Sequence, residues 1–181
     1  MKLSILTENI VSGKFLAEYG LSYLIEINDE QILFDAGHSD VFLKNAEKLG
    51  IDIKKNVKTV VLSHGHWDHG DGLKYIENKT LITHPASFIK RFRKADNSFV
   101  GLSFSRDEIK NRFNLIESQT PFEITKSLLF LGEIPLQNNF ESQTTTFVNE
   151  SGLPDFIPDD SALVAIKNKE LIVITGCSHS G

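Results

Sequence analysis

The order of predicted elements in this sequence indicates an α/β fold, in a single domain over residues 1–181. Segments with strand patterns alternate with segments of helical periodicity, and a turn rich in histidine and glycine directly follows a buried strand. The 181 residues are 40% hydrophobic and 24% charged, a balance that is typical of one globular domain and excludes collagen-like, disordered and coiled-coil chains.

Short apolar runs bounded by turn residues predict strands along the whole chain. The turns at 28–30 (Asn-Asp-Glu) and 167–169 (Lys-Asn-Lys) are typical of hairpins. Residues 58–63 contain three consecutive apolar residues, as expected of a strand that is buried on both faces. The predicted strands are 2–7, 21–27, 31–35, 58–63, 80–83, 128–131, 161–166 and 171–175.

Helices are predicted between several of these strands. Four apolar residues at helical spacing between 41 and 49 predict a helix that Gly50 ends. Shorter helices are expected near 71–77 and over 106–112. Residues 136–160 are polar and contain two prolines, so we expect a long loop there.

A basic cluster of Lys90, Arg91, Arg93 and Lys94 lies within the segment 88–123, which we expect to pack over the functional site. Runs of charge are usually a helix face exposed to solvent, and that is one interpretation of the cluster. The other interpretation is a clamp for an anionic substrate.

Charge and cysteine content restrict the environment and the partners. A net charge of −5 argues against nucleic acid or a membrane surface as a partner, so a small-molecule substrate is expected. Cys177 is the only cysteine, which excludes an intrachain disulfide and favours a reducing cytoplasm. The apolar run in residues 1–8 is too short for a signal peptide, and no apolar stretch reaches membrane-spanning length. We therefore expect a cytoplasmic protein.

The turn after the buried strand carries the pattern His-x-His-x-Asp-His, formed by His64, His66, Asp68 and His69. Residues i and i+2 of an extended segment project to the same side, so His64 and His66 can hold one ion together. Asp68 and His69 lie where the chain turns into a helix, and they can point at a second ion. Imidazole and carboxylate ligands suit zinc, with iron and manganese as alternatives.

Three stretches of the chain resemble the metallo-β-lactamase superfamily: 33–37 (Leu-Phe-Asp-Ala-Gly), 62–69 around the histidine motif, and 175–179 (Thr-Gly-Cys-Ser-His). With residues 8–9 and 20–22, they are similar to a branch related to a dihydropterin–ribofuranosylaminobenzene phosphate synthase. The resemblance implies an αββα sandwich of two mixed sheets and a site for two metal ions.

The resemblance also implies roles for residues outside the histidine motif. Asp35 would support the metal ligands, although a simple turn role after the strand is an alternative. His179 is expected as the remaining ligand. Cys177 stands where the superfamily has an aspartate that bridges both ions, and Asp160 lies near the place of a downstream histidine. Whether either replaces a usual ligand stays open, and a thiol with no ligand role is the alternative for Cys177.

The superfamily completes its second metal site with a histidine near the carboxy terminus that this sequence does not reach, so the domain is expected to be truncated there. The ion of His64, His66 and His179 is then expected to be better formed than the ion of Asp68 and His69. The missing part would leave a sheet edge bare, which makes an oligomer an alternative to a monomer.

The expected function is that of a zinc-dependent hydrolase acting on an ester, amide or phosphoester. Bound zinc lowers the pKa of its water to about 7, so hydroxide is the nucleophile, and Asp68 orients it as the catalytic residue. His38 and His84 are either structural or in contact with substrate. Alternative functions are a pterin-related transferase on the same metal site, a di-iron redox protein, and a non-catalytic binding module with an incomplete site.

Overall fold

The computed structural model describes residues 1–181, which form two compact units that alternate along the chain. The first unit comprises Met1–Leu62, His66–Ile82 and Ser103–Ile116, and the second comprises Ser63–Gly65, Thr83–Leu102 and Glu117–Gly181. The histidine motif therefore contributes residues to both units. That the whole chain is one domain stays a prediction.

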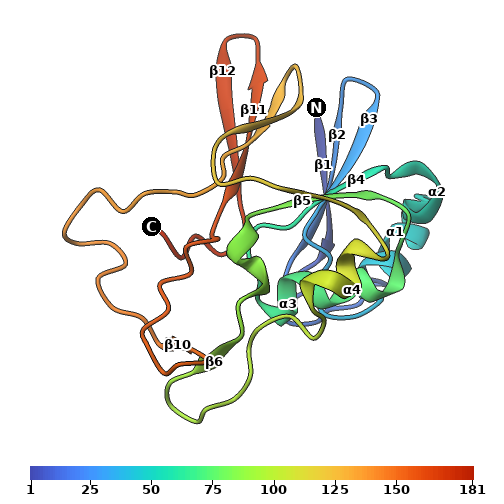
Figure 1. The fold of residues 1–181 in the computed structure, drawn as a ribbon. Helices are drawn as coiled ribbons and strands as arrows, with labels where there is room; N and C mark the ends of the chain where they lie inside the picture. The colour runs from blue at the N-terminus through green and yellow to red at the C-terminus, as the bar shows by residue number, and fades with distance from the viewer. The chain divides into compact units, whose positions relative to one another are not determined.

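The first unit contains a six-stranded mixed sheet (Figure 1). Its first three strands pair antiparallel, and the third, fourth and fifth pair parallel. In the order in which they lie in the sheet, the strands are β1 (Lys2–Thr7), β2 (Ser22–Ile27), β3 (Glu30–Phe34), β4 (Thr59–Val61), β5 (Thr80–Thr83) and β7 (Asn114–Glu117).

Local sequence explains how these strands are connected. Asn28 and Asp29 have left-handed φ angles of 49° and 65°, the backbone of a tight hairpin turn between β2 and β3. The parallel connections run through helices. Helices α1 (Val41–Lys48) and α2 (Ile53–Asn56) lie between β3 and β4, while α3 (Trp67–Gly70) and the 3-10 helix η1 (Asp71–Tyr75) lie between β4 and β5.

The central strands of this sheet are buried on both faces. Leu24 and its neighbour Ile25 in β2 are both fully buried, as are Val60 and Val61 in β4. Because successive residues of a strand point to opposite faces, this burial confirms the two-sided strand predicted at 58–63.

Helix α1 forms where the sequence predicts it, but its buried face differs from the predicted one. The predicted face included Leu49, which is 43% exposed, whereas Phe42 and Asn45 are buried. Asn45 is buried because its side-chain amide donates hydrogen bonds to the backbone oxygens of Leu6 and Leu16. Periodicity of apolar residues could not identify a face that contains a buried polar side chain.

Helix α4 (Arg106–Lys110) confirms the helix predicted at 106–112. The Ser105 side chain accepts a hydrogen bond from the Glu108 backbone N–H, and the Glu108 carboxylate accepts one from the Ser105 backbone N–H. This reciprocal pair satisfies donors at the helix start that have no partner within the helix. None of the helices is both long and apolar enough to cross a membrane.

We expect Ser105→Ala to lower the free energy of unfolding by about 1 kcal/mol, because the helix start loses its cap. Urea unfolding followed by circular dichroism measures this loss. Ser103→Ala, two residues earlier, removes an exposed side chain that is not part of the cap, and it should leave stability unchanged. Equal losses in the two variants would contradict the capping role.

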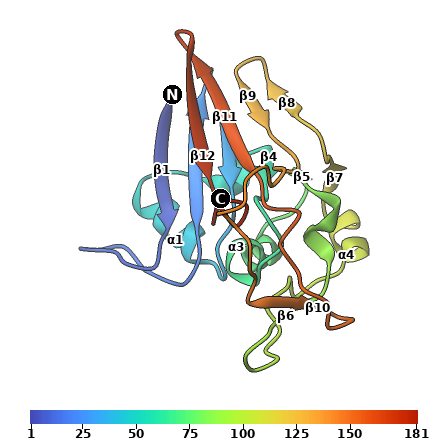
Figure 2. The same ribbon diagram turned by 90° about the vertical axis from the view of Figure 1, so that its left-hand side faces the viewer.

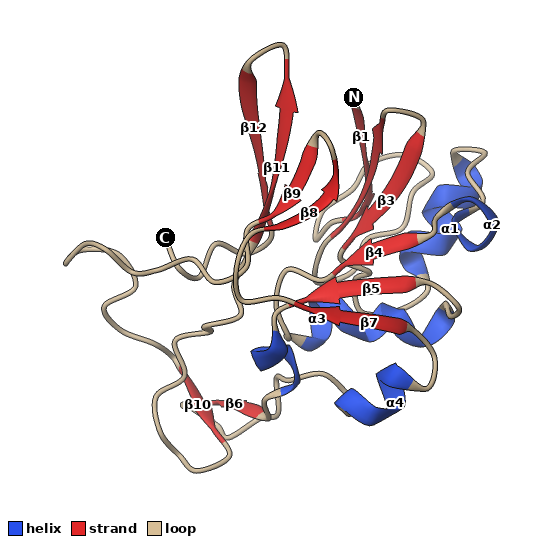
Figure 3. Ribbon diagram, turned by 45° about the horizontal axis from the view of Figure 1, so that its top comes forward, coloured by secondary structure: helices blue, strands red, loops and turns tan.

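The second unit is built of strands and loops, with one 3-10 helix, η2 (Pro85–Phe88) (Figure 3). Its larger sheet has the order β12-β11-β9-β8, with strands β8 (Phe122–Thr125), β9 (Leu128–Phe130), β11 (Ala162–Lys167) and β12 (Glu170–Thr175) side by side (Figure 2). Two mixed sheets were expected, but all pairings in this sheet are antiparallel. Tight turns such as the one at Asn168 and Lys169, which have left-handed φ angles of 52° and 67°, reverse the chain between neighbouring strands.

Two short strands in the second unit contradict the sequence prediction. Strand β10 (Phe147–Asn149) lies inside the predicted loop 136–160 and pairs with β6 (Arg91–Arg93). The basic cluster therefore lies on and beside a strand, and the prediction of a helix face is wrong. Strands of three residues carry too little pattern to be recognised in a sequence.

Candidate metal centre

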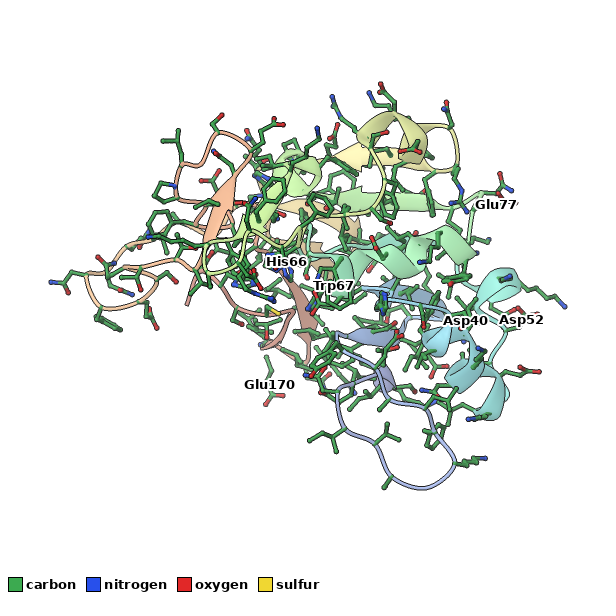
Figure 4. All side chains as sticks on the ribbon, turned by 90° about the horizontal axis from the view of Figure 1, so that it is seen from below. Asp40, Asp52, His66, Trp67, Glu77 and Glu170 are labelled. Atoms are coloured by element: carbon green, nitrogen blue, oxygen red, sulfur yellow. The ribbon has the colours of Figure 1, made fainter.

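In the first unit, His66 and His69 stand at the two ends of the first turn of α3. His66 is the residue before the helix and is buried, and Trp67 follows it directly (Figure 4). His69 is buried in the same turn, and its backbone oxygen accepts a hydrogen bond of 2.8 Å from the Ala36 N–H. The short helix thus fixes the backbone of the motif against the segment that follows β3.

Asp35 orients the ring of His69. The Asp35 Oδ2 atom lies 2.6 Å from His69 Nδ1, and both side chains are buried. Because an ionised carboxylate only accepts hydrogen bonds, His69 Nδ1 is the donor, and Asp35 thereby fixes the tautomer and the orientation of the ring. Asp35 also has a left-handed φ of 57°, so it takes part in the turn after β3 as well. The turn role is therefore present, and the support of a metal ligand by Asp35 stays a prediction.

Asp68 lies in the first turn of α3, half-buried, between Trp67 and His69. Gly20 has a left-handed φ of 109°, and a Cβ atom there would lie 1.7 Å from the Asp68 backbone oxygen. Only glycine allows this close approach, which holds the backbone of Asp68 in place. His38 is partly exposed and packs edge-on against Trp67 with the ring centroids 4.6 Å apart.

In the second unit, His64 and His179 lie close together. Their ring centroids are 4.9 Å apart, and each offers a ring nitrogen within 4.8 Å of the other's. His64 is fully buried, and its Nδ1 atom lies 2.9 Å from the Ser63 hydroxyl, a contact that orients the ring. The Cys177 sulfur also lies within 4.8 Å of a His64 ring nitrogen, and Cys177 is exposed. The expected approach of His179 to the motif is thus present at His64.

The backbone of Gly65 is held by a buried ion pair in the same unit. Gly65 N–H donates a 2.6 Å hydrogen bond to Asp159 Oδ2, and both Asp159 carboxylate oxygens accept hydrogen bonds from the Arg91 guanidinium. Burial alone would raise the pKa of Asp159, but the charge and hydrogen bonds of Arg91, with the Gly65 N–H, hold that pKa below its usual value. Asp159 is therefore ionised beside the motif.

Sequence reasoning did not assign these roles to Arg91 and Asp159. Arg91 was considered only as one member of the basic cluster, and it is fully buried and paired with acids of its own chain. Its neighbour Lys90 lies 3.6 Å from Glu150 and is exposed. Arg91 and Asp159 are 68 residues apart, so no local sequence pattern indicates that they form a pair.

Two further residues singled out by the sequence, His84 and Asp160, lie in the second unit. His84 is buried at the end of β5, where its Nδ1 atom accepts a hydrogen bond from the Ala86 N–H and caps η2. Burial lowers the pKa of His84, so this ring is neutral at pH 7. Asp160 accepts a 2.8 Å hydrogen bond from the Ser180 N–H and thereby fixes the turn that carries His179.

Comparison with known proteins adds a family match and close relatives. A model of the metallo-beta-lactamase superfamily matches residues 17–121. An uncharacterised protein of Methanocaldococcus jannaschii is 36% identical over 99% of this chain and 70% of its own length. From the same organism, 7,8-dihydropterin-6-methyl-4-(beta-D-ribofuranosyl)-aminobenzene-5'-phosphate synthase is 29% identical over 94% of this chain and 64% of its own length.

A solved structure covers the same extent of the chain. A crystal structure described as a metal-dependent hydrolase of the beta-lactamase superfamily superimposes with a TM-score of 0.85 at 33% identity, over 99% of this chain and 66% of that protein. This chain thus spans roughly two thirds of the length of each of these three proteins.

Proposed function

This chain belongs to the metallo-beta-lactamase superfamily, and on that basis we propose that it is a metal-dependent hydrolase acting on an ester, amide or phosphoester of a small molecule. The observation that carries the proposal is the arrangement of imidazoles, with the buried His64 beside the half-buried His179 and the buried His69 hydrogen-bonded to Asp35. The similar solved hydrolase supports it. Since the chain spans only part of its relatives, their activities are carried over as proposals.

The donor set fits a divalent metal. We propose that His64, His66 and His179 hold one ion, and that Asp68 and His69 contribute to a second. Imidazole nitrogens with a carboxylate suit zinc, and iron or manganese are alternatives. The orientation of two rings by Ser63 and Asp35 is the hydrogen bonding that metal-ligating histidines ordinarily have.

The chain's own residues have separate tasks in hydrolysis. A bound zinc ion would lower the pKa of water and polarise a carbonyl or phosphoryl oxygen. Asp68, which lies half-buried in the first turn of α3, would orient the attacking water. Asp35 keeps His69 in one tautomer throughout, because its hydrogen bond to Nδ1 is buried.

A second candidate function is a synthase reaction on the same metals, in which a pterin is transferred to a phosphorylated aminobenzene. The observation that favours it is the 29% identity with the archaeal pterin synthase over 94% of this chain. Both candidates need the same histidines, so only the substrates separate them.

Assays of the purified protein with and without metal test the proposal. We expect hydrolysis of a panel of phosphoesters, lactones and amides to disappear on dialysis against a chelator and to return on addition of Zn²⁺ or Mn²⁺. A parallel assay with a dihydropterin pyrophosphate and a ribofuranosylaminobenzene phosphate tests the synthase reaction. Condensation without hydrolysis would establish the second candidate, and hydrolysis that is unaffected by chelation would contradict both.

A further inference from the structure

We infer that Asp159, held by Arg91, is a positioning residue. It sets the orientation of the loop at residues 62–66, the proposed metal-binding loop, through the backbone N–H of Gly65. This inference rests on the proposed metal function and adds to it a residue that lies outside the histidine motif. Asp159 contacts neither substrate nor metal in this role, and it acts through the peptide that follows His64.

The Arg91 guanidinium donates hydrogen bonds to three residues of the second unit, Asp155, Asp159 and Ala86. The Arg91 side chain has no exposure to solvent, and its Nη1 and Nη2 atoms donate to the two carboxylate oxygens of Asp159 at 3.0 and 2.7 Å. Its Nε atom donates to Asp155 at 3.0 Å, and Nη2 also donates to the backbone oxygen of Ala86. A planar guanidinium with this many partners has one orientation, so Asp159 is held in one orientation as well.

Asp159 transmits this orientation to the loop. Its Oδ2 atom accepts the Gly65 N–H at 2.6 Å, which is short for a hydrogen bond to nitrogen and typical of an ionised acceptor. The Gly65 N–H belongs to the planar peptide that begins at the carbonyl of His64. Holding that plane in place restricts the backbone torsion ψ of His64, and with it the direction of the Cα–Cβ bond from which the imidazole extends.

Gly65 also contacts the 3-10 helix η2 of the same unit. A Cβ atom at Gly65 would lie 1.8 Å from the Ser87 backbone oxygen, so the loop backbone is in direct contact with η2. The Ser161 N–H also donates to the Ser63 oxygen at 3.1 Å. The peptide at Gly65 thus has a backbone oxygen in close contact at its Cα and a charged acceptor on its N–H, and both contacts restrict its rotation.

Stability alone is a poor explanation of this arrangement. A buried ion pair costs desolvation that its attraction roughly repays, so hydrophobic residues of similar volume would serve packing equally well. Asp155 also pairs with Arg91, but its other carboxylate oxygen accepts the Ile157 N–H within its own loop. Of the two acids on Arg91, the one that bonds to the metal-binding loop is Asp159, which makes Asp155 a matched control.

The test compares Asp159→Asn with Asp155→Asn in Zn²⁺ affinity, measured by competition with a chromophoric chelator. Asparagine at 159 offers one oxygen to three N–H donors, so we expect Asp159→Asn to bind Zn²⁺ about 10–100-fold more weakly than wild type. Asp155→Asn loses charge from the same cluster and should bind Zn²⁺ nearly as tightly as wild type.

Amide hydrogen exchange of Gly65 in the metal-free wild-type protein and the two variants provides a second readout that does not depend on metal. We expect this amide to be protected, and the protection to be retained in Asp155→Asn and lost in Asp159→Asn. Equal Zn²⁺ affinity of the two variants, or an unprotected Gly65 amide in wild type, would overturn the positioning role while the proposed metal function stands. Failure of the wild-type protein to bind Zn²⁺ would overturn both.

Discussion

Arg91→Met is expected to destabilise the folded chain by about 3–5 kcal/mol at neutral pH, because it leaves buried carboxylates without their cation. Asp159 is fully buried, and Asp155 nearly so. Methionine fills much of the volume of the arginine stem, so the loss reports charge more than packing. Denaturant unfolding at pH 7 measures it.

The loss of folding free energy in Arg91→Met is expected to become smaller as the pH falls. In wild type the pKa of Asp159 is held below its usual value, so its stabilising contribution is present above the pKa of the unfolded chain, about 3.9, and is lost as the pH falls through the folded-state pKa. In the variant, burial without Arg91 raises the pKa of Asp159, and protonation then removes the buried charge. The stability gap between wild type and variant should therefore narrow as the pH is lowered from about 8 to about 5.

Arg93→Met is the matched control on the same strand. Its guanidinium lies 3.8 Å from Asp96, and both side chains are about half exposed. Exposed pairs contribute at most about 1 kcal/mol, so this variant should be nearly as stable as wild type at every pH. A loss in Arg91→Met that equals the loss in Arg93→Met, or that does not change with pH, would contradict the assignment.

His64→Ala is expected to weaken Zn²⁺ binding by at least about 100-fold, because removal of a ligand should exceed the effect of removing a residue that only supports one. Hydrolysis should fall to background for the same reason. Isothermal titration with Zn²⁺ measures the first effect, and the substrate panel measures the second.

Two comparisons separate ligand loss from general damage in His64→Ala. Unfolding of the metal-free protein shows whether the variant still folds, since the buried ring also contacts Ser63. His38→Ala removes a partly exposed imidazole outside the motif and should leave Zn²⁺ affinity unchanged. Wild-type affinity in a folded His64→Ala would exclude His64 as a ligand.

Features encoded by neighbouring residues were predictable from the sequence. The hairpin turns at Asn28 and Asn168 have the left-handed backbone that short polar residues adopt, and both were expected. The strand before the motif and the α/β order were also correct, because each depends on a run of a few residues. The family followed from the motif itself and is confirmed.

Features that depend on distant partners were not predictable. Arg91 belongs to a cluster that resembles a solvated surface, and only the fold brings it to Asp155 and Asp159. Asn45 is buried because two backbone oxygens far away in sequence accept its amide. In both cases a polar residue is buried, whereas its polarity alone predicts a position on the protein surface. The ligand set stays a prediction.

The contact between Gly65 and Ser87 has a consequence for how such proteins diversify. The glycine between the first two histidines of the motif is required by the Ser87 backbone oxygen, which a Cβ atom at that position would meet. In a homologue whose turn at residues 85–88 lies farther away, alanine or serine could replace the glycine at position 65. A search pattern that insists on glycine would overlook such a protein, even though its ligands were complete.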